Sequence, residues 1–314
     1  VNCPNFDVME RLMIKNVIRV YKSRGLMWIL SRISSMFIFS LKKKYYSFKF
    51  KEVEVYKNPT EQELDKIEDA LRKNAVNLTD FFADKDDFEK FKLKYVFPED
   101  YHGGKNSGVW EEKLLEHYIA WKLLGIDYYE KDEIYIDIAA CDSPWAKMLR
   151  DINSILSYAI DLNLPTEYAS YSYYKRMDAT KTNFEKGSVC GVSLQCAYEM
   201  FVADSDIDLI KELQRILKDG GKAIISPLYL HTHSCHYASP DFYDKGYGDI
   251  DSKEYIIWNY YGIYSSRKYD AKKFKERILD LIENLGMKYK IYVVRNKNEV
   301  SNEIYMHFIL EIEK

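Results

Sequence analysis

The chain has 314 residues, of which 47% are hydrophobic and 30% charged, a balance typical of a globular protein rather than a disordered or membrane-embedded one. Its net charge of −3 gives no reason to expect nucleic-acid binding. The five cysteines form no CxxC pair. A disulfide framework and a zinc ribbon are therefore unexpected, and a reducing cytoplasm is the favoured location.

The first 50 residues are expected to form a basic amphipathic helical arm. The stretch from Leu26 to Leu41 is its longest apolar run, but it is shorter than the ~20 residues that span a bilayer, and Arg32 interrupts it. Lysine and arginine residues flank this run on both sides. Two interpretations stay open: residues 1–45 contact an anionic membrane surface, or the arm packs on its own domain or on the second subunit of a homodimer.

Residues 51–129 are expected to form a mainly helical section that contributes to the substrate site. Thr60 and Glu63 have the spacing of a capping box, in which each side chain satisfies a free backbone N–H of the other residue. Residues 75–108 show no periodic pattern and are expected to be irregular. Two helices are predicted in this section, over residues 59–74 and 109–124.

From residue 130 to residue 314 the pattern changes to strands that alternate with helices. The predicted strands cover residues 134–139, 155–161, 173–177, 189–194, 222–226, 288–294 and 304–312. The predicted helices cover residues 144–153, 206–217 and 271–284. This alternation predicts an α/β domain with a Rossmann-like, seven-stranded, mostly parallel sheet and helices on both faces.

Ligands of an open α/β sheet bind beyond the carboxyl ends of its strands. After the first predicted strand the residues are small, so that a ligand can approach the backbone. Asp161 ends the second strand, where a carboxylate can accept hydrogen bonds from both ribose hydroxyls. Asp178 follows the third strand, where it can accept from an adenine amine. The predicted cofactor contacts are Asp137, Ala139, Ala140, Cys141, Ser143, Asp161, Asp178, Ala179, Gln195 and Cys196.

Residues 133–226 resemble the class I S-adenosylmethionine (SAM)-dependent methyltransferases. Residues 135–139 are similar to the first motif of that family, and residues 178–180 to its "D-A-T/D-A" motif. Residues 187–201 resemble its fourth-strand segment, and residues 209–221 resemble its "E-x-x-R-V-L-K-P-G-G" helix and turn. The resemblance implies SAM as cofactor, with Asp161 at the ribose and the acid of the third strand at the adenine.

The first loop departs from the family pattern. Glycine is usual there at the positions of Ala139, Cys141 and Ser143, and each of these residues carries a Cβ atom. Glycine permits positive φ angles and close approach of a cofactor, so a reduced affinity for SAM is one consequence to expect.

The acceptor side is predicted to lie at the same edge of the sheet. Residues 231–270 form a long aromatic insertion that is expected to act as a lid. His231 or His233 is the predicted general base for a hydroxyl acceptor. The residues predicted to contact the substrate are His102, Trp110, Tyr198 and Trp258.

A metal site is not expected, although four potential ligands stand close together in the sequence. They are His231, His233, Cys235 and His236. Ligands packed so tightly rarely complete a tetrahedral site without a distant partner.

The sequence therefore predicts a SAM-dependent methyltransferase that methylates an oxygen atom of a sugar, a glycan precursor or another small metabolite. Two alternatives remain. One is an N-methyltransferase of a small amine, which needs no strong base. The other is a scaffold protein that keeps the fold without catalysis.

Overall fold

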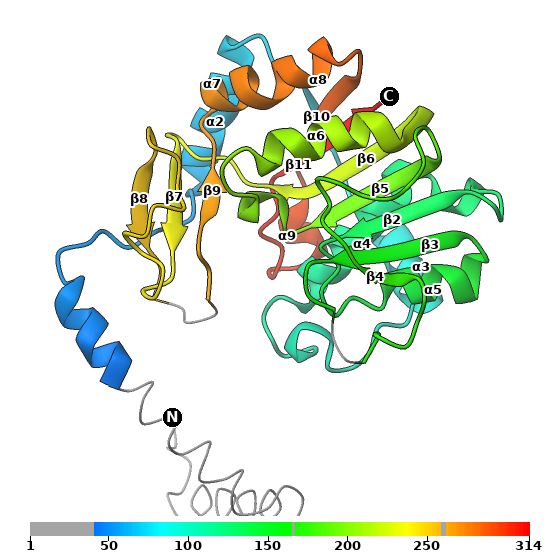
Figure 1. Ribbon diagram of the computed structural model, residues 1–314, viewed down its shortest axis with the longest axis horizontal. Coiled ribbons are helices and arrows are strands. Elements are labelled where there is room, and N and C mark those ends of the chain that lie inside the picture. Colours follow the sequence, from blue (N-terminus) through cyan, green and yellow to red (C-terminus); the bar gives the residue numbers. More distant parts are fainter. Residues whose placement is uncertain (1–40, 165–166, 259–261) are drawn as a thin grey trace, which may run out of the picture. The chain divides into compact units, whose positions relative to one another are not determined.

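The computed structural model describes residues 41–164, 167–258 and 262–314 (Figure 1). The predicted amino-terminal arm lies mostly outside these residues, but residues 41–49 are helical. The chain divides into two units, residues 1–54 and 55–314, and the elements below belong to the second unit. Within the described parts of the chain, no helix has the length and apolar character needed to cross a membrane.

An eight-stranded sheet forms the centre of the second unit, in the spatial order β1-β10-β11-β6-β5-β2-β3-β4. The strands are β1 (Leu78–Phe81), β2 (Ile134–Ile138), β3 (Leu156–Asp161), β4 (Tyr174–Arg176), β5 (Val189–Gln195), β6 (Leu217–Leu228), β10 (Lys288–Val294) and β11 (Phe308–Glu313). Only β11 runs antiparallel to its neighbours in this sheet, so the predicted Rossmann-like, mostly parallel sheet is confirmed. β1 is one strand more than the sequence predicted.

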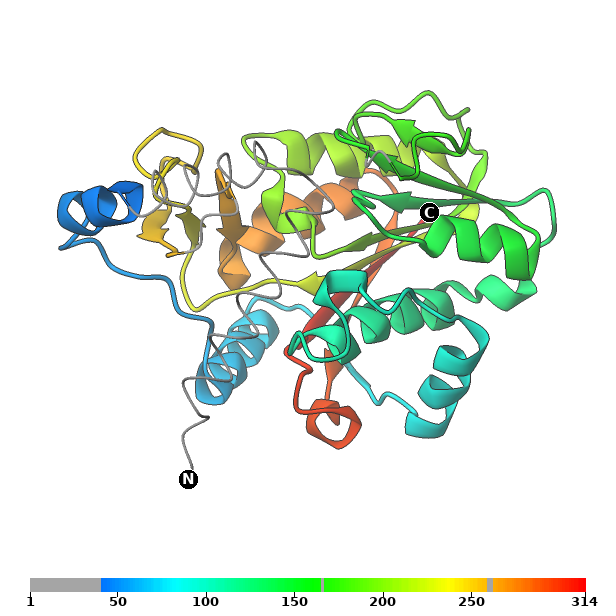
Figure 2. The same ribbon diagram turned by 90° about the horizontal axis from the view of Figure 1, so that it is seen from below.

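Helices cover both faces of the sheet (Figures 1 and 2). One face carries α2 (Glu61–Lys73), α6 (Ser205–Ile216), α7 (Ala271–Phe274) and α8 (Asp280–Asn284). The other carries α3 (Lys85–Lys94), α4 (Trp110–Leu124) and α5 (Trp145–Asn153). Shorter segments are the 3-10 turns η1 (Tyr101–Gly103), η2 (Ile126–Tyr128) and η3 (Tyr198–Met200), the π-helical turn η4 (Lys275–Leu279) and α9 (Lys297–Val300).

Successive residues of the central strands contribute to different hydrophobic clusters on the two faces, because side chains alternate across a sheet. A small third cluster contains Ala159 of β3 and Tyr174 of β4. In β2, Ile136 and Ile138 pack toward α6, whereas Tyr135 packs toward α4. Leu209 and Leu213 of α6 are fully buried against the first core. The carboxyl ends of the parallel strands are thereby left at one edge between the two helical layers.

The expectation that residues 75–108 are irregular is wrong, because β1 and α3 lie within them. Asp84 caps α3, since its side chain accepts a hydrogen bond from the Asp87 backbone N–H at 3.0 Å. Only Phe88 and Phe91 of this helix are buried, which is too few apolar positions to produce a visible helical period.

The capping box that was predicted before α2 is present. Thr60 and Glu63 exchange both side-chain-to-backbone hydrogen bonds. The insertion 231–270 is not a plain loop but holds a second, three-stranded sheet in the order β8-β7-β9. Its strands are β7 (Cys235–Ala238), β8 (Lys253–Ile256) and β9 (Ser266–Lys268).

Candidate functional site

A cavity of about 440 Å³ opens at the carboxyl ends of β2, β3, β4 and β5. Two acids stand on its wall: Asp161 is the last residue of β3, and Asp178 lies two residues beyond β4. The rest of the wall is largely apolar and includes Met177 and Phe201. The cavity therefore combines an apolar surface with two carboxylates at neighbouring strand ends.

A smaller cavity of about 130 Å³ adjoins it, and Ala139 and Cys196 line both. The smaller cavity holds three charged side chains, Asp137 near the end of β2 and Lys113 and Glu116 on α4. The two cavities together form a path along the strand ends, apolar at one end and charged at the other.

All ten residues predicted from the sequence to contact a cofactor line one of these two cavities. The larger cavity holds Asp161, Asp178 and Ala179, the smaller holds Asp137, Ala140, Cys141, Ser143 and Gln195, and Ala139 and Cys196 belong to both. Their contact with a cofactor stays a prediction.

The first loop adopts the backbone that glycine would favour. Ala139 and Cys141 have φ angles of 55° and 46°, in the left-handed region that L-residues rarely occupy. Asp161 supports this conformation, because its Oδ2 accepts a hydrogen bond from the Cys141 backbone N–H at 2.9 Å. The loop therefore has left-handed residues at two of the three positions where the family pattern has glycine, although both carry a Cβ atom.

The carboxylate of Asp137 is fully buried in the smaller cavity, and among the described residues neither of its oxygens meets a donor with good hydrogen-bond geometry, although the Ser143 and Ser193 hydroxyls are near enough to stabilise its charge. Burial raises its pKa to about 7, against the opposing effect of the nearby Ser143 and Ser193 hydroxyls. A buried acceptor with both oxygens unpaired is costly unless something else satisfies it, so this group is suited to receive a donor from a ligand.

A buried polar cluster links α4 to the end of β5. The Lys113 ammonium lies 2.8 Å from Glu116 Oε1 and 2.7 Å from Cys196 Sγ. Burial raises the pKa of Glu116 and that of the Cys196 thiol. Cys196 is therefore a neutral thiol at neutral pH, and the cluster holds one ammonium group against one carboxyl group.

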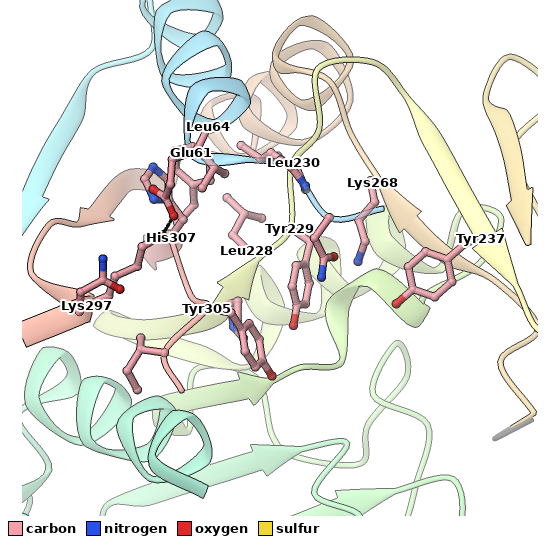
Figure 3. A pocket seen from close by; sticks show the side chains of 16 residues that line it. Glu61, Leu64, Leu228, Tyr229, Leu230, Tyr237, Lys268, Lys297, Tyr305 and His307 are labelled. Atoms are coloured by element: carbon pink, nitrogen blue, oxygen red, sulfur yellow. Dashed lines mark hydrogen bonds and ion pairs between the residues drawn. The ribbon is translucent and has the colours of Figure 1, made fainter. Parts of the chain in front are cut away.

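A third cavity, of about 370 Å³, lies beyond Cys196 (Figure 3). The hydroxyls of Tyr229 and Tyr305, which line it, lie 3.3 Å and 3.5 Å from Cys196 Sγ. Lys268 of β9 also lines this cavity, with its ammonium nitrogen 3.8 Å from the centroid of the Tyr229 ring. Burial lowers the pKa of Lys268, so this amine loses its proton more readily than an exposed lysine does.

The residues predicted to contact the substrate are dispersed. His102 lines the smaller cavity, where burial lowers its pKa. Trp110 and Tyr198 are buried and line none of the three cavities. Trp258 is 37% exposed and does not line any of them either.

The two histidines predicted to act as the general base also lie outside the three cavities. His231 instead lines a separate hollow with Thr232 and Asp270, and its ring stands 4.4 Å from the ring of His233. The Nε2 atom of His233 is 2.8 Å from the Tyr255 hydroxyl. The two rings are thus close to one another, and neither lines a cavity of the candidate site.

Several residues of the site were missed by the sequence reasoning. Lys113, Glu116 and His117 follow one face of α4, a helix that is otherwise apolar on most sides. Polar residues at this spacing on a buried helix are a signal that could have been used, since a helix buried on all sides has little reason to carry them. Tyr264 of the insertion lines the larger cavity, for which the sequence offered no specific signal.

Comparison with known proteins finds no matching family model and no matching curated protein. Among solved structures, geranyl diphosphate C-methyltransferase from Streptomyces coelicolor is 13% identical, with 79% of this chain and 97% of that chain covered and a TM-score of 0.40. The 1,6-didemethyltoxoflavin-N1-methyltransferase of Burkholderia thailandensis is 14% identical, with 76% and 94% covered and a TM-score of 0.42. A SAM-dependent methyltransferase from Archaeoglobus fulgidus is 12% identical, with 72% and 99% covered and a TM-score of 0.40. These structures are too dissimilar to assign a function to this chain, so its function has to be inferred from the side chains of the candidate site.

Proposed function

We propose that the chain is a SAM-dependent methyltransferase whose cofactor occupies the two joined cavities. The observation that carries this proposal is the path shared by Ala139 and Cys196, with two acids at its apolar end and a buried, unpaired carboxylate at its charged end. When bound, SAM would supply a methyl group: an acceptor oxygen or nitrogen would attack the methyl carbon in line with the carbon–sulfur bond, which breaks to release S-adenosylhomocysteine.

The larger cavity suits an adenosine group. Asp161 would accept hydrogen bonds from the ribose hydroxyls, and Asp178 would accept from the exocyclic amine of adenine. Met177 and Phe201 provide apolar surface for the ring faces. The small side chains of Ala139 and Cys196, which line both cavities, leave room for the methionine part of SAM to continue into the smaller cavity.

The smaller cavity suits the amino-acid end of SAM, which carries an ammonium and a carboxylate group. Asp137 would accept from the ammonium group, and Lys113 would face the carboxylate. Glu116 adds a second buried acid beside this position, which favours a cationic ligand overall. The charge pattern of the cavity is therefore complementary to the ammonium and carboxylate groups of SAM.

The third cavity is the proposed acceptor site. Its volume of about 370 Å³ lies in the range typical of small-molecule sites. Tyr229, Tyr237 and Tyr305 present rings and hydroxyls to it, and Asn58 and Asn298 add amide groups. This mixture of ring surfaces and hydrogen-bonding groups supports a sugar or a similar small polyhydroxy metabolite as the acceptor.

The general base is better assigned to Lys268 than to His231 or His233, because Lys268 lines the acceptor cavity and the histidines do not. Burial lowers its pKa and so favours loss of the amine proton, and in its neutral form the amine can take the proton of an acceptor hydroxyl. Base catalysis of this kind contributes roughly 10²–10⁴-fold to a rate.

Calorimetric titration of the full chain with SAM tests the cofactor site. Asp178→Ala and Asp161→Asn should each weaken binding by about tenfold or more, the loss of one charge-assisted hydrogen bond. Asp208→Ala, which removes an exposed acid of α6, is the matched control and should bind as the wild type does. No binding of SAM to the wild type would favour the scaffold alternative.

Methyl transfer to a panel of sugars and small amines tests the acceptor. With a hydroxyl acceptor, Lys268→Met should reduce the rate by about 10²-fold or more while SAM affinity is kept. Lys272→Met, at an exposed position on α7, is the control for loss of a positive charge. A rate that is unchanged in Lys268→Met would remove the base assignment and favour an amine acceptor.

A further inference from the structure

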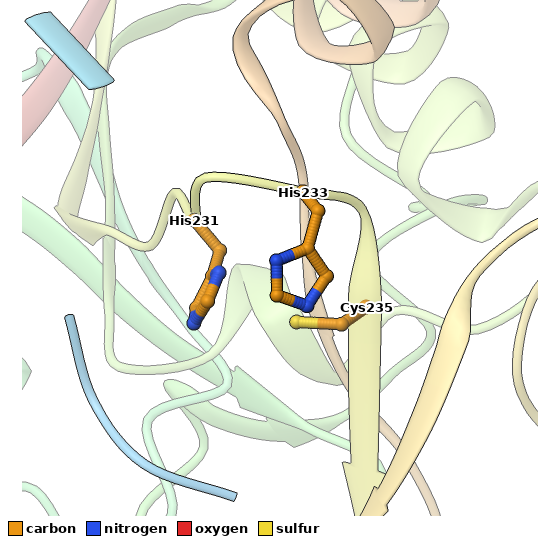
Figure 4. Close-up of side chains that lie close together, drawn as sticks. All are labelled: His231, His233 and Cys235. Carbon is orange, nitrogen blue, oxygen red and sulfur yellow. The ribbon is translucent and has the colours of Figure 1, made fainter. Parts of the chain in front are cut away.

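Three side chains with metal-binding atoms converge outside the proposed active site (Figure 4). His231, His233 and Cys235 each offer one ligand atom, and these atoms all lie within 4.8 Å of one another. We propose that these three residues bind a zinc ion.

The convergence follows from the chain path between β6 and β7. The chain bends at Thr232 and His233, and across this bend the side chains of His231, His233 and Cys235 lie close together (Figure 4). Both ends of the segment are fixed, since the His231 backbone N–H donates to the Tyr269 carbonyl at 2.8 Å and Cys235 pairs with Lys268 of β9. The three side chains are therefore held together by the backbone.

Hydrogen bonds also orient the two rings. The Thr232 hydroxyl lies 3.2 Å from the Nδ1 atom of His231 and 3.2 Å from that of His233. A metal-binding histidine normally engages its second ring nitrogen with a polar partner, which fixes the ring and its tautomer. The Thr232 hydroxyl can be this polar partner for both His231 and His233.

The Tyr255 hydroxyl, contributed by β8, is hydrogen-bonded to His233 Nε2 at 2.8 Å and so lies in the direction in which that nitrogen would bind the ion. Tyr255 must therefore turn aside when zinc binds, and a water molecule or this hydroxyl would then complete the site. His236, the neighbouring candidate in the sequence, points elsewhere, with its Nδ1 atom 2.8 Å from the Ser252 hydroxyl.

The three ligand atoms favour zinc over the common oxygen-binding metals. Two imidazole nitrogens and one thiolate form a borderline-soft set that suits Zn²⁺ and is a poor match for Mg²⁺ or Ca²⁺, which prefer oxygen. Cys235 is fully buried and His231 is 7% exposed, so the thiolate is shielded, and the partly exposed His233 leaves a route for the ion from solvent. Zinc would neutralise the thiolate that binding creates.

Metal analysis of the purified full-length chain, prepared without a histidine tag, tests the proposal. We expect about one zinc ion per chain that survives dialysis, and a loss of at least tenfold in zinc affinity in His231→Ala and in Cys235→Ser. His236→Gln and Cys190→Ser are the matched controls. They remove a ring and a buried thiol from outside the cluster and should keep the zinc.

Cobalt substitution gives a second measurement, and its first part uses only the wild type. Co²⁺ bound to the metal-free wild type should produce the absorption of a cobalt–thiolate bond, and Cys235→Ser should lack that absorption while Cys190→Ser retains it. Zinc well below one ion per chain after incubation with excess Zn²⁺, or a cobalt–thiolate band that persists in Cys235→Ser, would overturn the proposal.

Discussion

Asp161 Oδ2 accepts a hydrogen bond from the backbone N–H of Cys141 at 2.9 Å, and this contact joins the end of β3 to the loop after β2. The second oxygen of the same carboxylate accepts from the Asn163 N–H at 2.8 Å. Asp161 therefore organises the cavity as well as lining it. The contact holds Cys141 in a left-handed conformation that a residue with a Cβ atom does not favour.

Cys141→Gly should stabilise the folded chain by up to about 1 kcal/mol. The left-handed conformation costs a residue with a Cβ atom ~1–2 kcal/mol, and the greater freedom of glycine in the unfolded chain offsets ~0.5–1 kcal/mol of the gain. Urea unfolding of the full chain measures the difference. Ala140→Gly is the matched control: Ala140 does not have a positive φ, so this substitution should be destabilising. If the Cys141→Gly variant were less stable than the wild type, the inferred backbone strain at Cys141 would be contradicted.

The sheet could be predicted because its strands are apolar runs with clear ends. Once parallel strands are assigned, the residues after them must share one edge. The ten predicted positions could therefore be placed at that edge, where they line two cavities, without knowledge of any contact. The contact of Lys113 with Cys196 joins residues far apart in the sequence and depends on how α4 packs over β5. The position of Lys268 likewise depends on the pairing of β9 with β7, which no local pattern records.

Asp137 should make the stability of the chain depend on pH. Its pKa is about 7 in the folded protein and 3.8 ordinarily, so the folded state binds more protons than the unfolded state between these values. The free energy of unfolding therefore falls as pH rises from about 4 to about 7, by up to about 4 kcal/mol, and is constant above that range.

Asp137→Asn, which carries no charge at any pH, isolates this effect. Its stability relative to the wild type should increase between pH 4.5 and pH 8 when both are unfolded in urea without SAM. Other titrating groups are common to the two proteins and cancel in the difference. A stability difference that is the same at both pH values would show that Asp137 does not titrate in this range.

The Lys113–Glu116 pair should be strongly coupled, because the two side chains are only 11% and 1% exposed. Lys113→Met leaves the Glu116 carboxylate buried without its ammonium partner, and breaking a buried pair in this way costs ~3–5 kcal/mol. Adding Glu116→Gln removes the stranded charge and should restore a large part of the loss. Thermal or urea unfolding of the two single variants and the double variant gives the coupling energy. A double variant no more stable than Lys113→Met would mean that the charges do not interact.

Gly191 lies in the middle of β5, where a side chain would meet Tyr129. A Cβ atom on Gly191 would stand 2.2 Å from the Tyr129 hydroxyl oxygen, far inside contact distance, so Gly191→Ala should destabilise the chain by ~1–3 kcal/mol. Tyr129→Phe removes that oxygen and leaves the ring carbon Cζ at 3.2 Å and the Leu124 side chain at 3.4 Å as the nearest atoms. Gly191→Ala should therefore cost less in the Tyr129→Phe background than in the wild type, as measured by urea unfolding. An equal cost in both backgrounds would place the strain in the backbone of β5, which leads directly to Cys196, and not in the clash with Tyr129.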